Sequence, residues 1–119
     1  MKNLFPLDES KLISILQPGR DEIVVDKDRY CAFSGNDLRE VLRSGGIKHL
    51  VMAGVATSGG VILSTFTLAA DEDYGITILS DACADPKASL HEELMTNLFP
   101  RSATVLTVDQ WIALLPAKG

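Results

Sequence analysis

The 119-residue sequence has no run of basic residues, and its formal net charge is −5. Nucleic acids and anionic membrane surfaces select patches of Lys and Arg, so we expect neither as a partner. The sequence also lacks an apolar run long enough to cross a bilayer, and residues 1–6 lack the apolar core of a signal peptide. These absences predict a cytoplasmic protein.

Cysteine and histidine are scarce as well. Cys31 and Cys83 stand without a secretory context, which favours two free buried thiols over a disulfide. His49 and His91 show no paired spacing with other ligand types, so we expect neither a metal site nor a cofactor. The remaining composition, 46% hydrophobic and 23% charged, is typical of one soluble globular domain, residues 1–119.

The most informative stretch runs from Leu50 to Thr65. Residues 50–53 are apolar and end at Gly54, as in a parallel strand that is covered on both faces. From Val61 onward, apolar residues recur on two neighbouring helical stripes, which predicts a buried helix. Bare backbone amides are expected in the turn between them, where they can hold an anion or a developing oxyanion; the predicted binding residues are Thr57, Ser58, Gly59 and Gly60.

Further elements alternate along the chain. Helices are predicted over residues 8–16, from 37 to 44, from 85 to 100 and from 107 onward, and strands over 22–26, 50–53, 75–81 and 104–106. Capping boxes are predicted at 37–40 and 107–110, and Asp85 is expected to cap the helix of residues 85–100. Asp81 is expected to bind the amides of loop 82–85. This alternation predicts a parallel α/β sheet with right-handed crossovers.

Seven short motifs point to a family. In order they are Lys27-Asp-Arg-Tyr-Cys-Ala-Phe33, Gly35-Asn-Asp-Leu38, Gly46-Ile47, Ala53-Gly-Val-Ala-Thr57, Asp81-Ala-Cys-Ala84, His91 and Leu98-Phe-Pro-Arg101. Their order and spacing resemble the isochorismatase-like cysteine hydrolases from about residue 23 to residue 111. The resemblance implies a three-layer α/β/α, Rossmann-like fold with a mainly parallel sheet. It also implies an Asp, Lys and Cys triad that hydrolyses amides or, in the isochorismatases, a vinyl ether.

Only one member of that triad is found. Lys27 matches the family Lys. The position of the family Cys falls on Gly60 when the alignment starts from the strand and on Val61 when it starts from Ser64-Thr65, and neither residue can act as a nucleophile. The family Asp belongs to a strand expected before residue 1. The resemblance therefore implies a domain that is incomplete at its N-terminus, with two exposed sheet edges.

Two functions follow from these observations. The first is an isochorismatase-like hydrolase domain for a small molecule, catalytically impaired because the Cys and the Asp are missing. The alternative is a non-catalytic binding or assembly module whose sheet is completed by another chain or by a second copy in a homo-oligomer. A third interpretation is a fragment of a longer chain. The hydroxyls of Thr57 and Ser58 are expected to bond within the turn, because no His or carboxylate is visibly placed to activate them.

Overall fold

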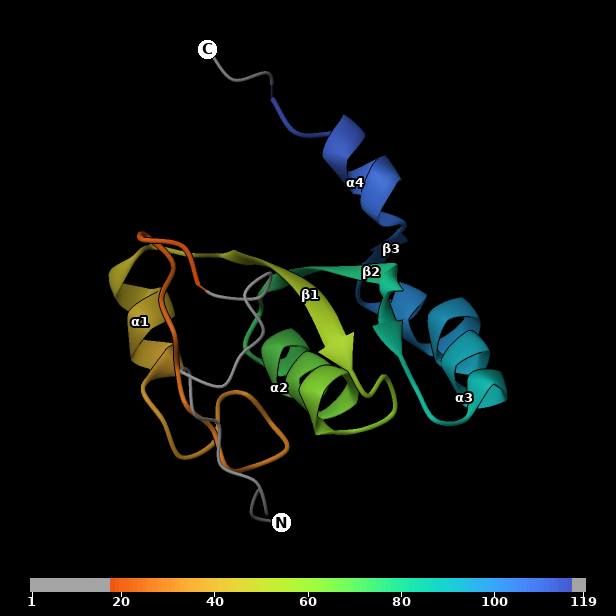
Figure 1. Cartoon of the computed structure of the whole chain (residues 1–119), viewed down its shortest axis with the longest axis horizontal. Helices are drawn as coiled ribbons and strands as arrows, with labels where there is room; N and C mark the ends of the chain where they lie inside the picture. The colour runs from red at the N-terminus through yellow and green to blue at the C-terminus, as the bar shows by residue number, and fades with distance from the viewer. Residues whose placement is uncertain (1–17, 117–119) are drawn as a thin grey trace.

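The computed structural model describes residues 18–116, except for the side chains at positions 60 and 61. The helix predicted over residues 8–16 lies outside this part. The described elements are α1 (Leu38–Ser44), β1 (His49–Val55), η3 (Gly60–Ser64), α2 (Thr65–Asp71), β2 (Gly75–Ala84), α3 (Ala88–Glu93), η4 (Leu94–Leu98), η5 (Phe99–Arg101), β3 (Thr104–Leu106) and α4 (Val108–Ala113) (Figure 1). Here η3 and η4 are π-helical turns and η5 is a 3-10 turn.

The three strands form one parallel sheet in the order β1-β2-β3. Leu50 lies opposite Ile76, and Met52 opposite Ile78. The predicted parallel α/β sheet is therefore confirmed. The strand predicted over residues 22–26 is wrong, because this segment pairs with no described strand and the side chain of Ile23 is 70% exposed. A short apolar segment does not form a strand unless a neighbouring strand takes its hydrogen bonds.

The core lies on one face of the sheet. In Figure 1, α1, α2 and α3 lie on one side of the strands and α4 lies on the other. Met52 and Ile78, on the same face by register, pack with Phe66 of α2 and Phe99 of η5. The rings of Phe66 and Phe99 meet edge to face, with centroids 5.0 Å apart. Flanking helices thus cover the sheet, but most of the buried apolar side chains lie between it and η3, α2, η4 and η5, whereas α1 and α3 contribute no buried residue.

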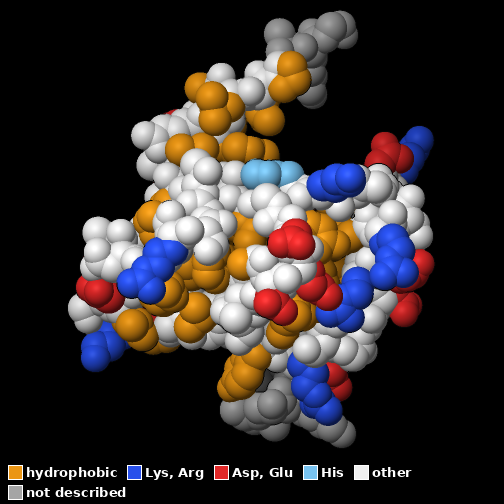
Figure 2. Space-filling view, turned by 180° about the vertical axis from the view of Figure 1, so that it is seen from behind, with side chains coloured by type: hydrophobic (Ala, Val, Ile, Leu, Met, Phe, Trp, Pro, Cys, Tyr) orange, Lys and Arg blue, Asp and Glu red, His pale blue; other side chains and the backbone are white. Residues whose placement is uncertain are grey.

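The other face is less fully covered. Val51 is 39% exposed and Val55 is 66% exposed, whereas Met52 on the opposite face of the same strand is buried. Figure 2 shows hydrophobic side chains on the protruding part of the molecule that carries α4, and a further group across the body below it. Among the described helices none is long and apolar enough to span a membrane.

The predicted helix caps had different outcomes. The capping box of Thr107 and Gln110 is confirmed, with both reciprocal hydrogen bonds present at 3.1 and 2.9 Å. The box predicted at Asp37 is wrong, because Asn36 Oδ1 accepts the Leu38 amide instead at 2.9 Å. Asp81 does not bind the amides of residues 82–85 as expected, because residues 82–84 extend β2. Its Oδ1 accepts the Val108 amide at 2.8 Å and so caps α4.

The beginnings of β1 and β2 are packed tightly. The Gly75 amide donates to the Lys48 carbonyl at 2.9 Å, and His49 Nε2 lies 2.9 Å from Thr77 Oγ1. A Cβ on Gly75 would collide with the His49 ring. Glycine at position 75 is therefore what lets the two strands start side by side.

Candidate active site

The site predicted from the sequence is the turn after β1, at the carboxyl edge of the parallel sheet, where ligands bind in open α/β sheets. Gly54 pairs with Cys83 and Val55 with Ala84 at the end of β2. The next peptide bond, Val55–Ala56, is cis. The Thr57 amide then donates to the Ala84 carbonyl at 2.9 Å. The turn is thus fastened to the last residues of β2.

Thr57 is joined to α3 through its side chain. Its Oγ1 lies 2.7 Å from Nδ1 of His91, and Thr57 is completely buried. A buried hydroxyl needs a hydrogen-bond partner, and His91 supplies it. The sequence analysis did not pair these residues. Since solvent does not reach Thr57, its hydroxyl holds the turn in place and is not exposed to a bound molecule.

Ser58 is joined to Asp85, the second residue that the sequence analysis did not place at the turn. The amide and the Oγ of Ser58 both donate to Asp85 Oδ1, at 2.7 and 2.6 Å, while Oδ2 accepts the Lys87 amide at 3.1 Å. The Ser58 hydroxyl and amide lower the pKa of Asp85. A carboxylate with a lowered pKa is a weak base, so this contact orders the turn rather than activating Ser58 as a nucleophile.

The expectation that the amides of the turn are bare is wrong at three positions. The Thr57 amide is bonded to Ala84, the Ser58 amide to Asp85, and the Gly59 amide to the Ala56 carbonyl at 3.2 Å. The Gly59 carbonyl in turn accepts the amides of Leu63 and Ser64 as η3 begins. Binding of an oxyanion by this turn stays a prediction. Of the four residues predicted to bind it, Gly60 is the one whose amide is not among these bonded groups.

Comparison with known proteins shows which family the sequence belongs to. The sequence matches the isochorismatase domain over residues 7–110. The chain belongs to the isochorismatase family. Two similar proteins are the phenazine biosynthesis protein PhzD1 of Pseudomonas aeruginosa, 32% identical over 86% of this chain and 49% of its own length, and the ureidoacrylate amidohydrolase RutB of Variovorax paradoxus, 33% identical over 86% of this chain and 40% of its own.

Solved structures of this family have a similar fold. An isochorismatase-like hydrolase from Alkaliphilus metalliredigens is similar with a TM-score of 0.77 and 37% identity, over 85% of this chain and 54% of its own length. The N-carbamoylsarcosine amidase of Thermoplasma acidophilum is similar with a TM-score of 0.72 and 26% identity, over 92% and 58%. The chain therefore spans about half the length of these isochorismatase-like relatives.

Neither cysteine of this family member stands in the turn. Cys83 lies opposite Gly54 in the sheet and is buried. Burial raises the pKa of its thiol; the Gly54 backbone opposes this shift, and the charge of Asp81 adds to it. Cys31 is half-buried and packs against the core. Both thiols are free as expected, but only Cys83 is buried, and Cys31 is half-buried. The residues at the start of η3 are Gly60 and Val61.

Lys27, the residue that matches the family Lys, lies half-buried in the irregular segment before α1. Within residues 18–116 no hydrogen bond or ion pair of its side chain joins it to the turn. Its catalytic role in this chain stays a prediction. No three His, Cys, Asp or Glu side chains of the described residues lie together as a metal site would require.

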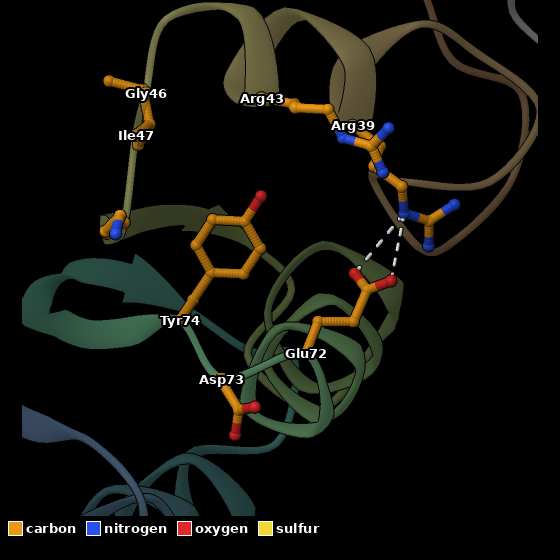
Figure 3. A pocket seen from close by; sticks show the side chains of 8 residues that line it. Arg39, Arg43, Gly46, Ile47, Glu72, Asp73 and Tyr74 are labelled. Atoms are coloured by element: carbon orange, nitrogen blue, oxygen red, sulfur yellow. Dashed lines mark hydrogen bonds and ion pairs between the residues drawn. The ribbon is translucent and has the colours of Figure 1, made fainter.

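A cavity of about 470 Å³ lies elsewhere, where β1 and β2 begin, and is lined by Arg39, Arg43, Gly46, Ile47, Lys48, Glu72, Asp73 and Tyr74. Arg39 Nε pairs with Glu72 at 3.1 Å. In Figure 3 the Tyr74 ring points toward α1, whereas Asp73 points away. The lining carries three cationic side chains and two acidic ones, and the cavity is separate from the turn.

Proposed function

We propose that this chain is an isochorismatase-family module that binds a small molecule at the turn after β1 without cleaving it through a covalent enzyme intermediate. One observation carries the proposal: Gly60 and Val61 open η3 where the resemblance expects the nucleophilic Cys. Covalent acyl transfer requires a nucleophile, and neither residue has one. The nearby Ser58 hydroxyl donates to Asp85, so it does not replace the thiol.

The class of molecule is inferred from the relatives. RutB is named for the amide bond that it hydrolyses, and PhzD1 for a biosynthetic pathway. A small carbonyl compound or vinyl ether with an anionic group suits a turn beside a helix start, because such a start favours negative charge. We propose that Lys27 supplies the electrostatic contact to that group.

Activity and binding can be tested separately. Purified protein is incubated with isochorismate and with a panel of amides that includes ureidoacrylate, and products and protein mass are followed by mass spectrometry. We expect no turnover above background and no covalent adduct. Robust turnover that is lost in Lys27→Ala but kept in Lys48→Ala, a matched Lys at the opposite sheet edge, would overturn the proposal of impaired catalysis.

Binding is followed by the shift in melting temperature that each compound produces, since a ligand that binds the folded state stabilises it. We expect a shift for at least one anionic member of the panel. The shift should disappear in Lys27→Ala and persist in Lys48→Ala. A panel that stabilises neither the wild type nor the variants would contradict small-molecule binding at this turn.

A second candidate function is an assembly module. It is favoured by the position of β1, which pairs only with β2 among the described strands and exposes Val51 and Val55. A strand inside a parallel sheet is normally covered on both faces. The mass of the protein in solution tests this function, because a well-folded monomer would count against it.

A further inference from the structure

The cavity where β1 and β2 begin lies at the opposite end of the sheet from the turn after β1. Its volume of about 470 Å³ is within the usual range of small-molecule sites. One wall is the end of α1 with the loop that follows it, and the other is the turn between α2 and β2 (Figure 3). Its lining includes none of the residues predicted to bind a ligand at the turn after β1.

The two acidic side chains of the lining leave most of its positive charge in place. Glu72 is occupied by Arg39, whose Nε lies 3.1 Å from Glu72 Oε1. Asp73 points away from the cavity, as Figure 3 shows. In the described part of the chain, these two carboxylates therefore pair with one of the three cations and form no ion pair with the other two.

The other two cations, Arg43 and Lys48, have no close carboxylate. Arg43 Nη1 lies 4.0 Å from Glu40 Oε2, and these side chains are 73% and 69% exposed, so the contact is weak. Lys48 forms no ion pair with a described residue. Arg43 also lies one helical turn after Arg39 on α1, where like charges repel each other. The cavity thus presents two positive charges that an anion would compensate.

Tyr74 adds a hydrogen-bond donor that is aimed across the cavity. Its hydroxyl points toward α1 in Figure 3 and has no hydrogen-bond partner among the described residues. Phe33 holds the ring, with the two rings stacked at 6.1 Å between centroids, and the Arg39 guanidinium lies over the same Phe33. Gly46 in the other wall leaves open space, since a Cβ there would meet no atom within 4 Å. An oriented phenol beside two cations is a preorganised contact for an anionic oxygen.

We propose that this cavity binds the phosphate group of a small organic phosphate. At neutral pH a phosphate monoester carries about two negative charges and three acceptor oxygens. The planar guanidinium of Arg43 matches two of these oxygens, Tyr74 donates to the third, and Lys48 supplies the second positive charge. A carboxylate has one charge and two oxygens, so it would leave one cation without a partner. The organic part then lies against the Tyr74 ring and Ile47, which is 43% exposed.

An NMR titration of the isotope-labelled full chain tests this site. Phenyl phosphate, inorganic phosphate and benzoate are each added at constant ionic strength, and sodium chloride is the control for non-specific anion binding. Phenyl phosphate should shift the amides of residues 43–48 and 72–75 saturably and bind more tightly than inorganic phosphate, because its ring adds apolar contact. Benzoate, which carries the same ring on a singly charged group, should bind at least about tenfold more weakly than phenyl phosphate.

Two variants test the proposed contacts. Arg43→Gln should raise the Kd of phenyl phosphate at least about tenfold, because it removes charge-assisted hydrogen bonds from an exposed position. Tyr74→Phe should raise the Kd at least about threefold, since it removes the hydroxyl and keeps the ring stacked on Phe33. Arg101→Gln is the matched control, because Arg101 is exposed on η5 and is not part of the lining, and it should leave the Kd unchanged.

Several results would each overturn the inference. Shifts that sodium chloride reproduces would indicate an adventitious ion only. Saturable shifts centred on residues 56–60 would place the phosphate in the turn, benzoate that binds as tightly as phenyl phosphate would exclude a phosphate site, and a Kd unchanged in both Arg43→Gln and Tyr74→Phe would exclude the proposed contacts.

The phosphate site goes beyond the function proposed for the turn, and the two can fail separately. Lys27→Ala should keep the binding of phenyl phosphate in the cavity, because Lys27 is not part of the lining. A wild type that binds no phosphate, but is still stabilised through Lys27 by a member of the amide panel, would overturn this inference and leave the function of the turn standing.

Discussion

Nδ1 of His91 on α3 lies 2.7 Å from Oγ1 of Thr57, a side chain that solvent does not reach. The two residues are 34 positions apart, so this bond joins the turn after β1 to the helix after β2. A buried hydroxyl that loses its only partner retains the cost of desolvation. His91 is therefore a positioning residue for the turn.

His91→Ala should lower the free energy of unfolding by about 1–3 kcal/mol, because it leaves the Thr57 hydroxyl buried and unpaired. Urea denaturation measures the change. Thr57→Val removes the hydroxyl and keeps the shape of the side chain, so the double variant should be less destabilised than the sum of the single variants. Additive effects would show that the two side chains do not interact.

The Ser58–Asp85 contact should make the stability of the protein depend on pH in the acidic range. The pKa of Asp85 is lowered in the folded state, so the contact stabilises the protein above the pKa of the unfolded carboxyl, about 3.9, and this contribution is lost as pH falls through the folded pKa. Asp85→Asn should therefore lower the melting temperature at pH 7, and the difference from wild type should shrink near pH 2.

Ser58→Ala should reproduce part of this effect, because it removes one of the two hydrogen bonds to Oδ1. Asp21→Asn is the control, since Asp21 is exposed and makes no hydrogen bond with another described residue. Equal pH dependence in wild type and Asp85→Asn would contradict the prediction.

The two predicted capping boxes provide a matched pair. Thr107→Ala should destabilise α4 by about 0.5–2 kcal/mol, because its side chain accepts the Gln110 amide. Asp37→Ala should change α1 by less than about 0.5 kcal/mol, because Asp37 makes no capping bond. Amide exchange of each helix measures the two effects locally. A larger effect at Asp37 than at Thr107 would contradict the cap geometry.

Phe99→Ala should be strongly destabilising. Phe99 is completely buried and meets the Phe66 ring edge to face at 5.0 Å. Removing a buried Phe side chain costs about 3–5 kcal/mol. Guanidinium denaturation measures the loss, with Leu114→Ala as an exposed apolar control that should change stability by less than about 0.5 kcal/mol. Equal losses of stability in the two variants would contradict the burial of Phe99 in the core.

Iodoacetamide should distinguish the two thiols. Burial raises the pKa of Cys83 and shields it, whereas Cys31 is half-buried, so Cys31 should be alkylated first at pH 8. Mass spectrometry of peptides after increasing reaction times gives the two rates. Faster modification of Cys83 would contradict its burial in β2.

The sequence predicted the elements whose apolar residues are continuous. Residues 50–53, 75–81 and 104–106 were expected as strands and lie within β1, β2 and β3. Residues 22–26 carry a similar pattern but form no strand, because pairing depends on a neighbour that local sequence does not specify. Thr107 caps its helix through hydrogen bonds with a residue only three positions later, and so short a spacing can be recognised as a sequence motif.

The candidate site was only partly predictable for the same reason. The sequence located the turn, but its expectation that Asp85 caps the next helix is wrong: α3 starts at Ala88 after Lys87, and Asp85 Oδ2 accepts the Lys87 amide before the helix. It did not show that Asp85 also holds Ser58, or that His91 holds Thr57, because these partners are 27 and 34 residues apart. Periodicity reports which face of an element is apolar, but not which polar side chains meet.

Position 75 limits what substitutions this domain tolerates. Any side chain there would push the His49 ring away, and the ring would then lose its bond with Thr77. The same residue donates its amide to the Lys48 carbonyl, so a shift of its backbone would also disturb the first pair of the sheet. Because glycine has no side chain, β1 and β2 can begin directly beside each other at this position.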